Sequence, residues 1–190
     1  MKRAIILASG PSLTQVDADM AMNAGDWTVI AVNSTWQRVP GCDVIYAGDM
    51  EWWGYWHDRI DSPARRWTCH AEAARRYGLN LHQVAPGVYN SGMRAIQFAV
   101  SQGAERILLL GFDCSTEKGT HWHGDHPAGL RNPGPASRFR WQAHFATLRP
   151  LQHDTCIINC SRETTLTQFP RQSLRAALNG EKPDGSAFTD

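Results

Sequence analysis

The sequence predicts an α/β protein built as a single Rossmann-like domain, with an open, mostly parallel twisted sheet flanked by helices and a long histidine-rich lid loop. Two observations carry this prediction: short apolar runs recur along the chain, and segments with helical patterns lie between them. The runs are rich in Ile, Val and Leu, which is typical of parallel strands buried on both faces. They cover residues 4–8, 27–32, 43–47, 66–69, 106–110 and 155–159. Strands that alternate with helices form βαβ units, and such units build a parallel sheet.

Three segments between the runs are predicted to be helices. Residues 71–77 are rich in Ala and Arg, and residues 91–102 carry many apolar side chains. The second segment ends at Gly103, a residue typical of helix C-termini. Residues 137–148 place large apolar side chains at mixed spacing. We expect one domain over residues 1–178 and a frayed tail over residues 179–190.

The composition favours a globular domain and argues against several classes of protein. Of the 190 residues 42% are hydrophobic, and the formal net charge is +1, so we expect neither a disordered chain nor an electrostatic binder of nucleic acid. No apolar stretch approaches the roughly 20 residues that a membrane span needs. The chain enters a strand without the layout of a signal peptide, which predicts a cytoplasmic protein. The five cysteines form no CxxC pair and are expected to be free thiols.

The first apolar run leads directly into Ser9, Gly10, Pro11 and Ser12, a turn of small residues that can open a helix. At such a turn backbone N–H groups point outward, and the dipole of the following helix favours an anion. The alternative is an ordinary turn between a strand and a helix that binds nothing. We expect the turn to hold a phosphate group of a nucleotide or another phosphorylated ligand.

Small or polar residues also follow four of the other predicted strands. They are Asn33, Asp49, Gly111, Asp113 and Ser161. Because the carboxyl ends of parallel strands share one edge of the sheet, where ligands bind, these residues predict one convergent site. Taken singly, an Asx-turn would explain Asn33, and a cap at the end of a strand would explain Asp113.

The segment over residues 51–57 is unusually aromatic and contains Trp52, Trp53 and Trp56. One interpretation is a pocket wall or a platform on which a ring stacks. The other is an aromatic cluster that packs the start of a helix. We take Trp52 and Trp53, together with Trp122, as candidates for the wall of an acceptor site.

Residues 114–136 form a long irregular stretch, and loops of this length in compact domains are usually functional. The stretch contains His121, His123, Asp125 and His126, so we predict a lid or an active-site loop. Histidine is the side chain best suited to proton transfer near neutral pH. A polar loop that only contacts substrate is the alternative.

The string HWHGDHPAG, which begins at His121, fits the pattern HxHxDHxxG. It resembles the metal-binding signature of the metallo-β-lactamase superfamily, which supplies zinc ligands and a water-orienting aspartate. The string lies late in this chain and follows a parallel α/β pattern, which argues against that fold. If a metal binds, the expected ligands come from His121, His123, Asp125 and His126.

Taken in order, the motifs resemble those of a known transferase family. The matching segments are residues 8–13, Val32-Asn33, residues 46–49, Asn90-Ser91-Gly92-Met93, Gly111-Phe112-Asp113, residues 121–126 and residues 157–161. The chain looks like the bacterial sialyltransferases of the Campylobacter type, and like the related family of archaeal hydroxymethylpterin pyrophosphokinases and motility-associated glycosyltransferases. The resemblance spans roughly residues 3 to 175.

The resemblance implies a transferase that takes a nucleotide-activated donor and transfers a glycosyl group. It implies that the donor is bound by Ser9, Gly10, Pro11, Ser12, Asn33, Asp49, Asn90, Ser91, Gly92, Gly111 and Ser161. The catalytic residues would be His123, His126 and Asp113, with one lid histidine as general base. The order of the motifs does not decide between His123 and His126. Arg94, Arg131 or Arg138 would offset the charge of the leaving group.

Two departures from that family keep other functions open. The lid is shorter, and Asp49 stands where the sialyltransferases have a neutral amide, which suggests ribose binding or Mg²⁺. The first alternative is a Mg²⁺-dependent pyrophosphokinase of a pterin-like substrate, with the metal on Asp49 or Asp113. The second is a metal-dependent hydrolase that uses the histidine loop. The third is a non-catalytic nucleotide-binding module.

The expected partner is a small nucleotide-activated donor, and a homo-oligomer stays open. No cofactor is firmly predicted: Mg²⁺ is the open alternative, and Zn²⁺ is disfavoured. A small stand-alone domain of this kind would suit a phage gene.

Overall fold

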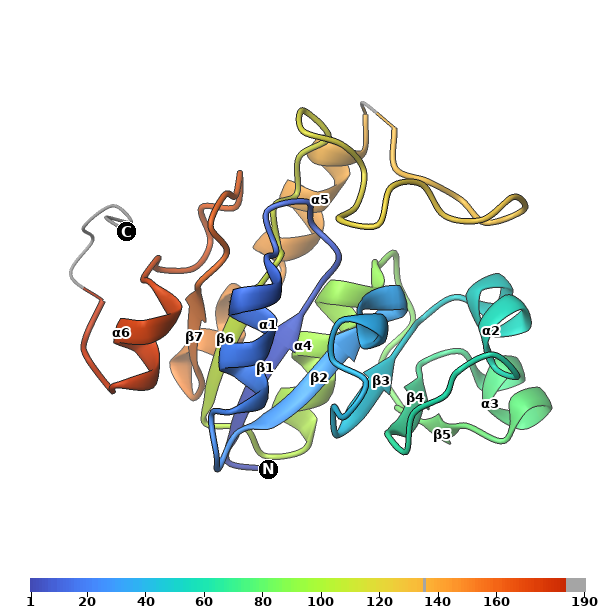
Figure 1. The fold of residues 1–190 in the computed structure, drawn as a ribbon, viewed down its shortest axis with the longest axis horizontal. Helices are drawn as coiled ribbons and strands as arrows, with labels where there is room; N and C mark the ends of the chain where they lie inside the picture. The colour runs from blue at the N-terminus through green and yellow to red at the C-terminus, as the bar shows by residue number, and fades with distance from the viewer. Residues whose placement is uncertain (135, 184–190) are drawn as a thin grey trace.

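The computed structural model describes residues 1–134 and 136–183 and confirms the predicted α/β class. Its sheet has seven parallel strands in the order β5-β4-β3-β2-β1-β6-β7 (Figure 1). The strands are β1 Arg3–Leu7, β2 Thr28–Val32, β3 Val44–Tyr46, β4 Arg65–Thr68, β5 Asn80–Leu81, β6 Arg106–Leu110 and β7 Cys156–Asn159. The helices are α1 Gln15–Met22, α2 Met50–Trp56, α3 Ala71–Tyr77, α4 Ser91–Ser101, α5 Ser137–Ala146 and α6 Leu174–Leu178, with 3₁₀ turns η1 Asn33–Gln37 and η2 Arg149–His153.

Both faces of the sheet are buried, which explains why β1, β2 and β6 are apolar at every position after the first. In β1, Ile5 and Leu7 face one hydrophobic core, whereas Ala4 and Ile6 face the other. All four side chains are completely buried. Full burial of an Ile or Leu side chain contributes about 1.5–3 kcal/mol. Alternation of side chains along each strand therefore supplies both cores from the same residues.

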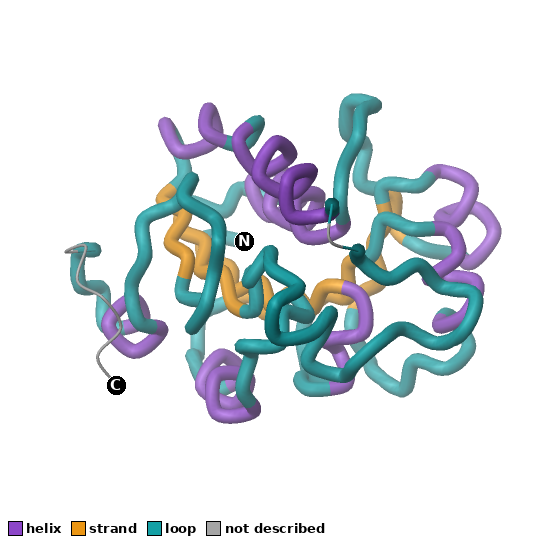
Figure 2. Tube along the Cα trace, turned by 90° about the horizontal axis from the view of Figure 1, so that it is seen from above, coloured by secondary structure: helices purple, strands orange, loops and turns teal. Residues whose placement is uncertain are grey.

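The helices form one layer on each face of the sheet. The first core joins the sheet to α1, α2, α3 and α6, and the second joins it to α4 and α5. Figure 2, seen from above, shows the strands between the two groups of helices. Because both layers are filled, ligands have access chiefly at the ends of the strands.

The chain reverses its direction across the sheet beside β1. From β1 it moves outward through β2, β3 and β4 to β5, and then returns through α4 to β6 on the other side of β1. Such a reversal opens a crevice outside the carboxyl ends of the strands, where ligands of α/β proteins bind. Figure 1 shows the long segment between β6 and α5 extending above this edge.

The structure differs from the predicted elements in a few places. The exposed two-residue strand β5 has no apolar run that would predict it. A helix was expected after the first turn, without bounds, and it is α1; α2 and α6 were not predicted. The aromatic run forms α2, so its rings are distributed by helical geometry.

The start of the expected frayed tail is ordered. The N–H of Glu181 donates to the carbonyl of Ala176, and Gln172 donates to the carbonyl of Glu181. These bonds hold the chain against α6. Residues 184–190 of the expected tail lie outside the described residues.

The remaining expectations concern cysteines and membrane spans. The five cysteines are free thiols, as expected, and Cys156 is exposed. Within the described part of the chain, none of the helices has the length and apolar character needed to cross a bilayer.

Candidate functional site

Two adjoining cavities lie at the carboxyl edge of the sheet. The inner cavity encloses about 600 Å³, its open mouth included, between the ends of β1 and β6 and the start of α4. The outer cavity encloses about 1270 Å³ on the same basis and extends toward α2 and the long segment. The two share the lining residues Asn33, Asn90, Ser91, His121 and Trp141. Together they form one continuous site.

Most of the residues predicted for the site line one of these cavities. The inner cavity is lined by Ser9, Gly10, Asn33, Asn90, Ser91, Gly92, Gly111, Asp113 and His121. The outer cavity adds Asp49, Trp52 and His126. Polar residues from several strand ends are therefore brought together, as the parallel sheet predicted.

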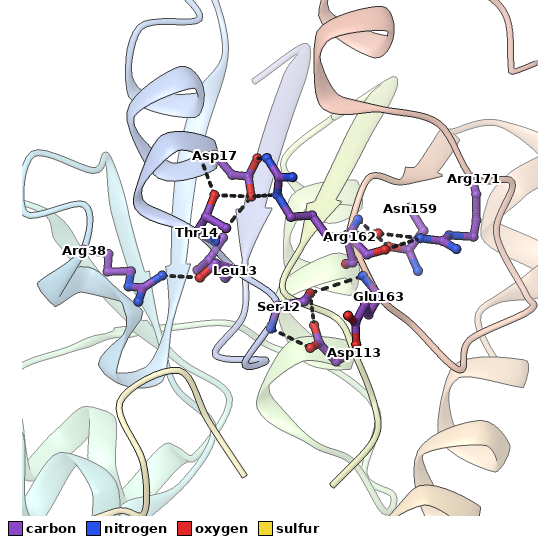
Figure 3. A network of polar contacts seen from close by, with 11 residues as sticks. Ser12, Leu13, Thr14, Asp17, Arg38, Asp113, Asn159, Arg162, Glu163 and Arg171 are labelled. Atoms are coloured by element: carbon purple, nitrogen blue, oxygen red, sulfur yellow. Dashed lines mark hydrogen bonds and ion pairs between the residues drawn. The ribbon is translucent and has the colours of Figure 1, made fainter. Parts of the chain in front are cut away.

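The turn of residues 9–12 is arranged differently from the expected phosphate site. The N–H of Gly10 donates to the carbonyl of Gly111 at 2.9 Å, and Pro11 has no N–H. The N–H and the hydroxyl of Ser12 both donate to the Asp113 carboxylate, each at 2.7 Å (Figure 3). A carboxylate thus occupies the place expected for phosphate, and Pro11 and Ser12 line neither cavity. The N–H groups of Gly10 and Ser12 therefore already have partners within the protein, while Ser9 and Gly10 line the inner cavity.

The N-terminus of α1 is likewise neutralised from within the protein. Thr14 caps the helix, and Asp17 completes the capping box. Asp17 is 5% exposed and accepts two hydrogen bonds from Arg162, at 2.8 and 3.0 Å. Burial raises the pKa of Asp17, but the hydrogen bonds from Arg162 and Thr14 outweigh it, so the pKa falls below the ordinary value. An anion would find the positive end of this helix already occupied.

Asp113 positions the first turn rather than presenting a free carboxylate to substrate. Burial raises its pKa, while the bonds from Ser12 act in the opposite direction. A Cβ on Gly10 would lie 2.2 Å from its Oδ1, and a Cβ on Gly111, where φ is +68°, would lie 2.4 Å from the carbonyl oxygen of Ala8. The two glycines therefore permit the ends of β1 and β6 to touch. These contacts give Asp113, which was predicted to be catalytic, a positioning role at the edge of the inner cavity.

Ser161 is another structural residue among the predicted donor ligands. It is 1% exposed, and its Oγ accepts the N–H of Phe112 at 2.8 Å. Its own N–H donates to Oδ1 of Asn159. Ser161 therefore holds the loop after β6 and lines neither cavity.

Two asparagines present unsatisfied polar atoms at the cavities. Asn33, at the end of β2, adopts a positive φ of 50°, a conformation that asparagine tolerates better than most residues. Asn90 caps α4, and its Oδ1 accepts the N–H of Met93 at 2.8 Å. This bond leaves Nδ2 of Asn90 buried, and Oδ1 of Asn33 is buried as well; neither has a hydrogen-bond partner among the described residues. The site thus offers one acceptor and one donor to a ligand.

The aromatic wall is built from residues that only partly match the prediction. Trp52 lines the outer cavity, and its Nε1 donates to Oγ of Ser34 at 3.3 Å. Trp53 is completely buried and donates to the carbonyl of Ala47, so it cannot contact a ligand. Trp122 lines neither cavity, and the Arg38 guanidinium lies 4.1 Å from its ring centre. The assignments of Trp53 and Trp122 to the wall are corrected accordingly.

Sequence reasoning missed Trp141 and Phe145, which line the inner cavity beside Phe112. They stand four residues apart on α5 and therefore share one helical face. That spacing was the available signal. Arg140, also unforeseen, lines the outer cavity with Arg131.

Asp49 lies at the outer cavity between α4 and the long segment. Its Oδ2 accepts a hydrogen bond from the Ser91 hydroxyl at 3.2 Å, and the same hydroxyl accepts the N–H of Gly48. Loss of solvent around the carboxyl raises the pKa of Asp49, whereas the Ser91 bond and the charge of nearby His126 lower it. Asp49 therefore supplies an acceptor at the mouth of the site.

His121, His123 and His126, here called the histidine cluster, stand against the first turn. Their ring centres lie 4.9, 4.4 and 5.1 Å apart. Burial and the neighbouring imidazoles lower the pKa of His121 to about 3 and that of His123 to about 4, and burial also lowers the pKa of His126. The cluster is therefore neutral near pH 7. Asp125 is exposed and bonds to the Thr120 hydroxyl.

Comparison of the chain with known protein families and with curated proteins found no match in either case. What the fold and the cavities define is the class: a Rossmann-like α/β protein with a polar and aromatic pocket at the carboxyl edge of its sheet.

Proposed function

We propose that the protein is a transferase that binds a nucleotide-activated donor in the two cavities and transfers a glycosyl group. The observation that carries the proposal is the pair of buried, unpartnered amide atoms, Oδ1 of Asn33 and Nδ2 of Asn90. A buried polar atom without a partner costs about 1–3 kcal/mol. A ligand that carries both a donor and an acceptor, such as a nucleobase or a sugar, removes both penalties.

The inner cavity suits a flat, partly apolar ring. Trp141, Phe145 and Phe112 line it, and the rings of Phe112 and Phe145 meet edge to face at 5.9 Å. Aromatic side chains bind bases by stacking, whatever the base, while the amide atoms supply the orientation. The base or the sugar of the donor therefore lies in the inner cavity.

The phosphates are assigned to the start of α4 instead of the first turn. Ser91 and Gly92 open this helix, whose positive end faces the shared part of the site. Arg131 and Arg140 line the outer cavity and can offset the charge of a leaving phosphate. Arg94 cannot, because it is buried and donates to the carbonyl of Ala85 and to Gln97.

The acceptor enters through the outer cavity, beside Asp49 and His126. Of the two histidines considered as general base, His126 lines this cavity and His123 does not. The pyrophosphokinase alternative is weakened, because both oxygens of Asp113 are held by Ser12, which leaves Asp49 alone as a candidate Mg²⁺ ligand.

A nucleotide panel tests the proposal. CMP, UDP, GDP and ATP, with the matching nucleotide sugars, are titrated while thermal unfolding is followed. A ligand at ten times its Kd adds roughly 1.4 kcal/mol of stability, which the shift in Tm reveals. We expect one nucleotide class to bind, and the proposal fails if none shifts Tm at millimolar concentration.

Matched variants then test the amide pair. Asn33→Gly keeps the positive φ and removes the acceptor, and Asn90→Ser keeps the cap and removes the donor. Each should weaken binding about 10-fold. Asn23→Gly, at the far end of α1, should bind like the wild type. Unchanged binding in both site variants would contradict the assignment.

A further inference from the structure

The histidine cluster has the composition and the convergence of a metal site. One ring nitrogen of each histidine lies within 4.8 Å of a ring nitrogen of the other two. A tetrahedral ion about 2.0–2.1 Å from each nitrogen needs them roughly 3.3 Å apart. Each spacing between nitrogens therefore has to shorten by at most about 1.5 Å for the three to reach one ion.

The cluster also presents the lone pairs that a cation needs. Nε2 of His121, Nε2 of His123 and Nδ1 of His126 are buried and have no hydrogen-bond partner among the described residues. Buried polar atoms are nearly always bonded to protein, water or an ion. A single cation bound to all three nitrogens would give each of them the partner that it lacks among the described residues.

The surroundings of the cluster orient its rings. Nδ1 of His121 shares a hydrogen bond of 2.8 Å with the Ser9 hydroxyl, which leaves its Nε2 for another partner. A hydrogen bond to the second ring nitrogen is the kind that fixes the orientation of a metal-binding imidazole. The backbone N–H of Trp122 donates to the carbonyl of Ser9, and the backbone N–H of His126 donates to Oδ1 of Asn132, so these two bonds hold the loop that carries the rings.

We propose that His121, His123 and His126 bind one divalent transition-metal ion, with Zn²⁺ as the first candidate. Imidazole nitrogens select Zn²⁺, Cu²⁺, Ni²⁺ and Fe²⁺ over Mg²⁺ and Ca²⁺. This revises the expectation from the sequence that Zn²⁺ is disfavoured. The three histidines of the string that begins at His121 lie close together although the fold is a parallel α/β sheet.

Three protein ligands leave a fourth position open. His121 and His126 line the outer cavity, where Asp49 supplies a negative charge close to His126. An open position is typical of catalytic rather than structural zinc. The ion would supply a Lewis acid at this point of the cavity. With Nδ1 on the ion, His126 would serve as a metal ligand and not as the general base of the proposed function.

Metal analysis of untagged protein tests the inference. The protein is stripped with chelator, exchanged into metal-free buffer and titrated with Zn²⁺ by calorimetry, and with Co²⁺ by absorption. We expect one equivalent of Zn²⁺ with a micromolar or lower Kd, a visible Co²⁺ spectrum of tetrahedral type, and a higher Tm with metal.

The matched variants are His123→Asn, His126→Asn and, as control, His153→Asn, which lies on η2 away from the cluster. The first two should weaken Zn²⁺ binding at least 100-fold, and the control should not change it. Equal loss in the control, or wild-type binding weaker than about 100 μM, would overturn the site. Far-ultraviolet circular dichroism checks that each variant folds.

The metal titration contains no nucleotide, and the nucleotide panel can be run on the stripped protein. Metal binding without nucleotide binding therefore leaves this inference standing and removes the proposed function. The reverse result removes the metal site alone.

Discussion

Replacement of Asp113 tests whether its carboxylate holds the first turn. Its two oxygens accept bonds of 2.7 Å from the N–H and the hydroxyl of Ser12, and the residue is 4% exposed. Hydrogen bonds to an ionised acceptor contribute about 1.5–3 kcal/mol each. Burial raises the pKa of Asp113, so desolvation of the carboxylate offsets part of this gain. We expect Asp113→Ala to lower the free energy of unfolding by about 3 kcal/mol.

Asp113→Asn is the matched variant, because it keeps the shape and removes the charge. The amide oxygen can accept the N–H of Ser12, and the amide nitrogen can donate to Oγ of Ser12 once that hydroxyl rotates. Burial raises the pKa of Asp113, so the neutral amide avoids the cost of desolvating a charge at this position. We therefore expect Asp113→Asn to cost about 1 kcal/mol or less.

Urea unfolding at pH 7, followed by tryptophan fluorescence, measures both variants through the midpoint and the slope m. A loss below about 0.5 kcal/mol in Asp113→Ala would refute the positioning role. If Asp113→Asn loses as much as Asp113→Ala, the negative charge itself holds the turn, and the reasoning from hydrogen-bond geometry fails.

Three further predictions address the packing and charges around the site. Arg162→Gln should lower the free energy of unfolding by about 2 kcal/mol at pH 7, because it leaves the buried Asp17 without its ion pair. Since the pKa of Asp17 in the folded protein is depressed, this loss should shrink as pH falls below the ordinary value of 3.8. A loss in urea unfolding that does not depend on pH would contradict the ion pair. Gly10→Ala should lower Tm markedly, because the new Cβ would lie 2.4 Å from the carbonyl oxygen of Gly111. Gly134→Ala is the control, because its new Cβ would have no atom within 4 Å. Calorimetry should give a lower Tm for the first variant than for the second. Trp53→Ala should cost about 3–5 kcal/mol in chemical unfolding as a core residue, and a loss under about 1 kcal/mol would show that the ring is not core.

The elements predicted best are those whose signal is local. The strand over residues 106–110 and the helix over residues 71–77 have the predicted bounds, because apolar runs and helical patterns express burial and spacing along the chain. Strand β5 failed because two exposed residues carry no such pattern. Asn33 was placed at the site because the ends of parallel strands converge by topology, whereas Asn90 was placed there through the resemblance to the transferase family.

The errors concern contacts between segments far apart in the sequence. Ser12 and Asp113 are 101 residues apart, and only the pairing of β1 with β6 brings them together. From the sequence we predicted that Ser12 binds the donor and that Asp113 is catalytic, whereas in the structure the two residues bind each other. Trp52 and Trp53 differ in the same way: adjacent residues on a helix point in directions about 100° apart, and the phase of α2 was not known.

The place of β1 inside the sheet, between β2 and β6, bears on the order in which the chain can fold. One neighbour of β1, β2, follows within the next few tens of residues, but the other, β6, begins at Arg106, and Ile5 pairs there with Leu108. During synthesis one edge of β1 stays unpaired until about half of the chain has emerged. Contacts between distant segments slow folding and expose apolar edges meanwhile. We therefore expect the ends of β1 and β6, which touch beside the inner cavity, to meet late in folding, after β1 has paired with β2.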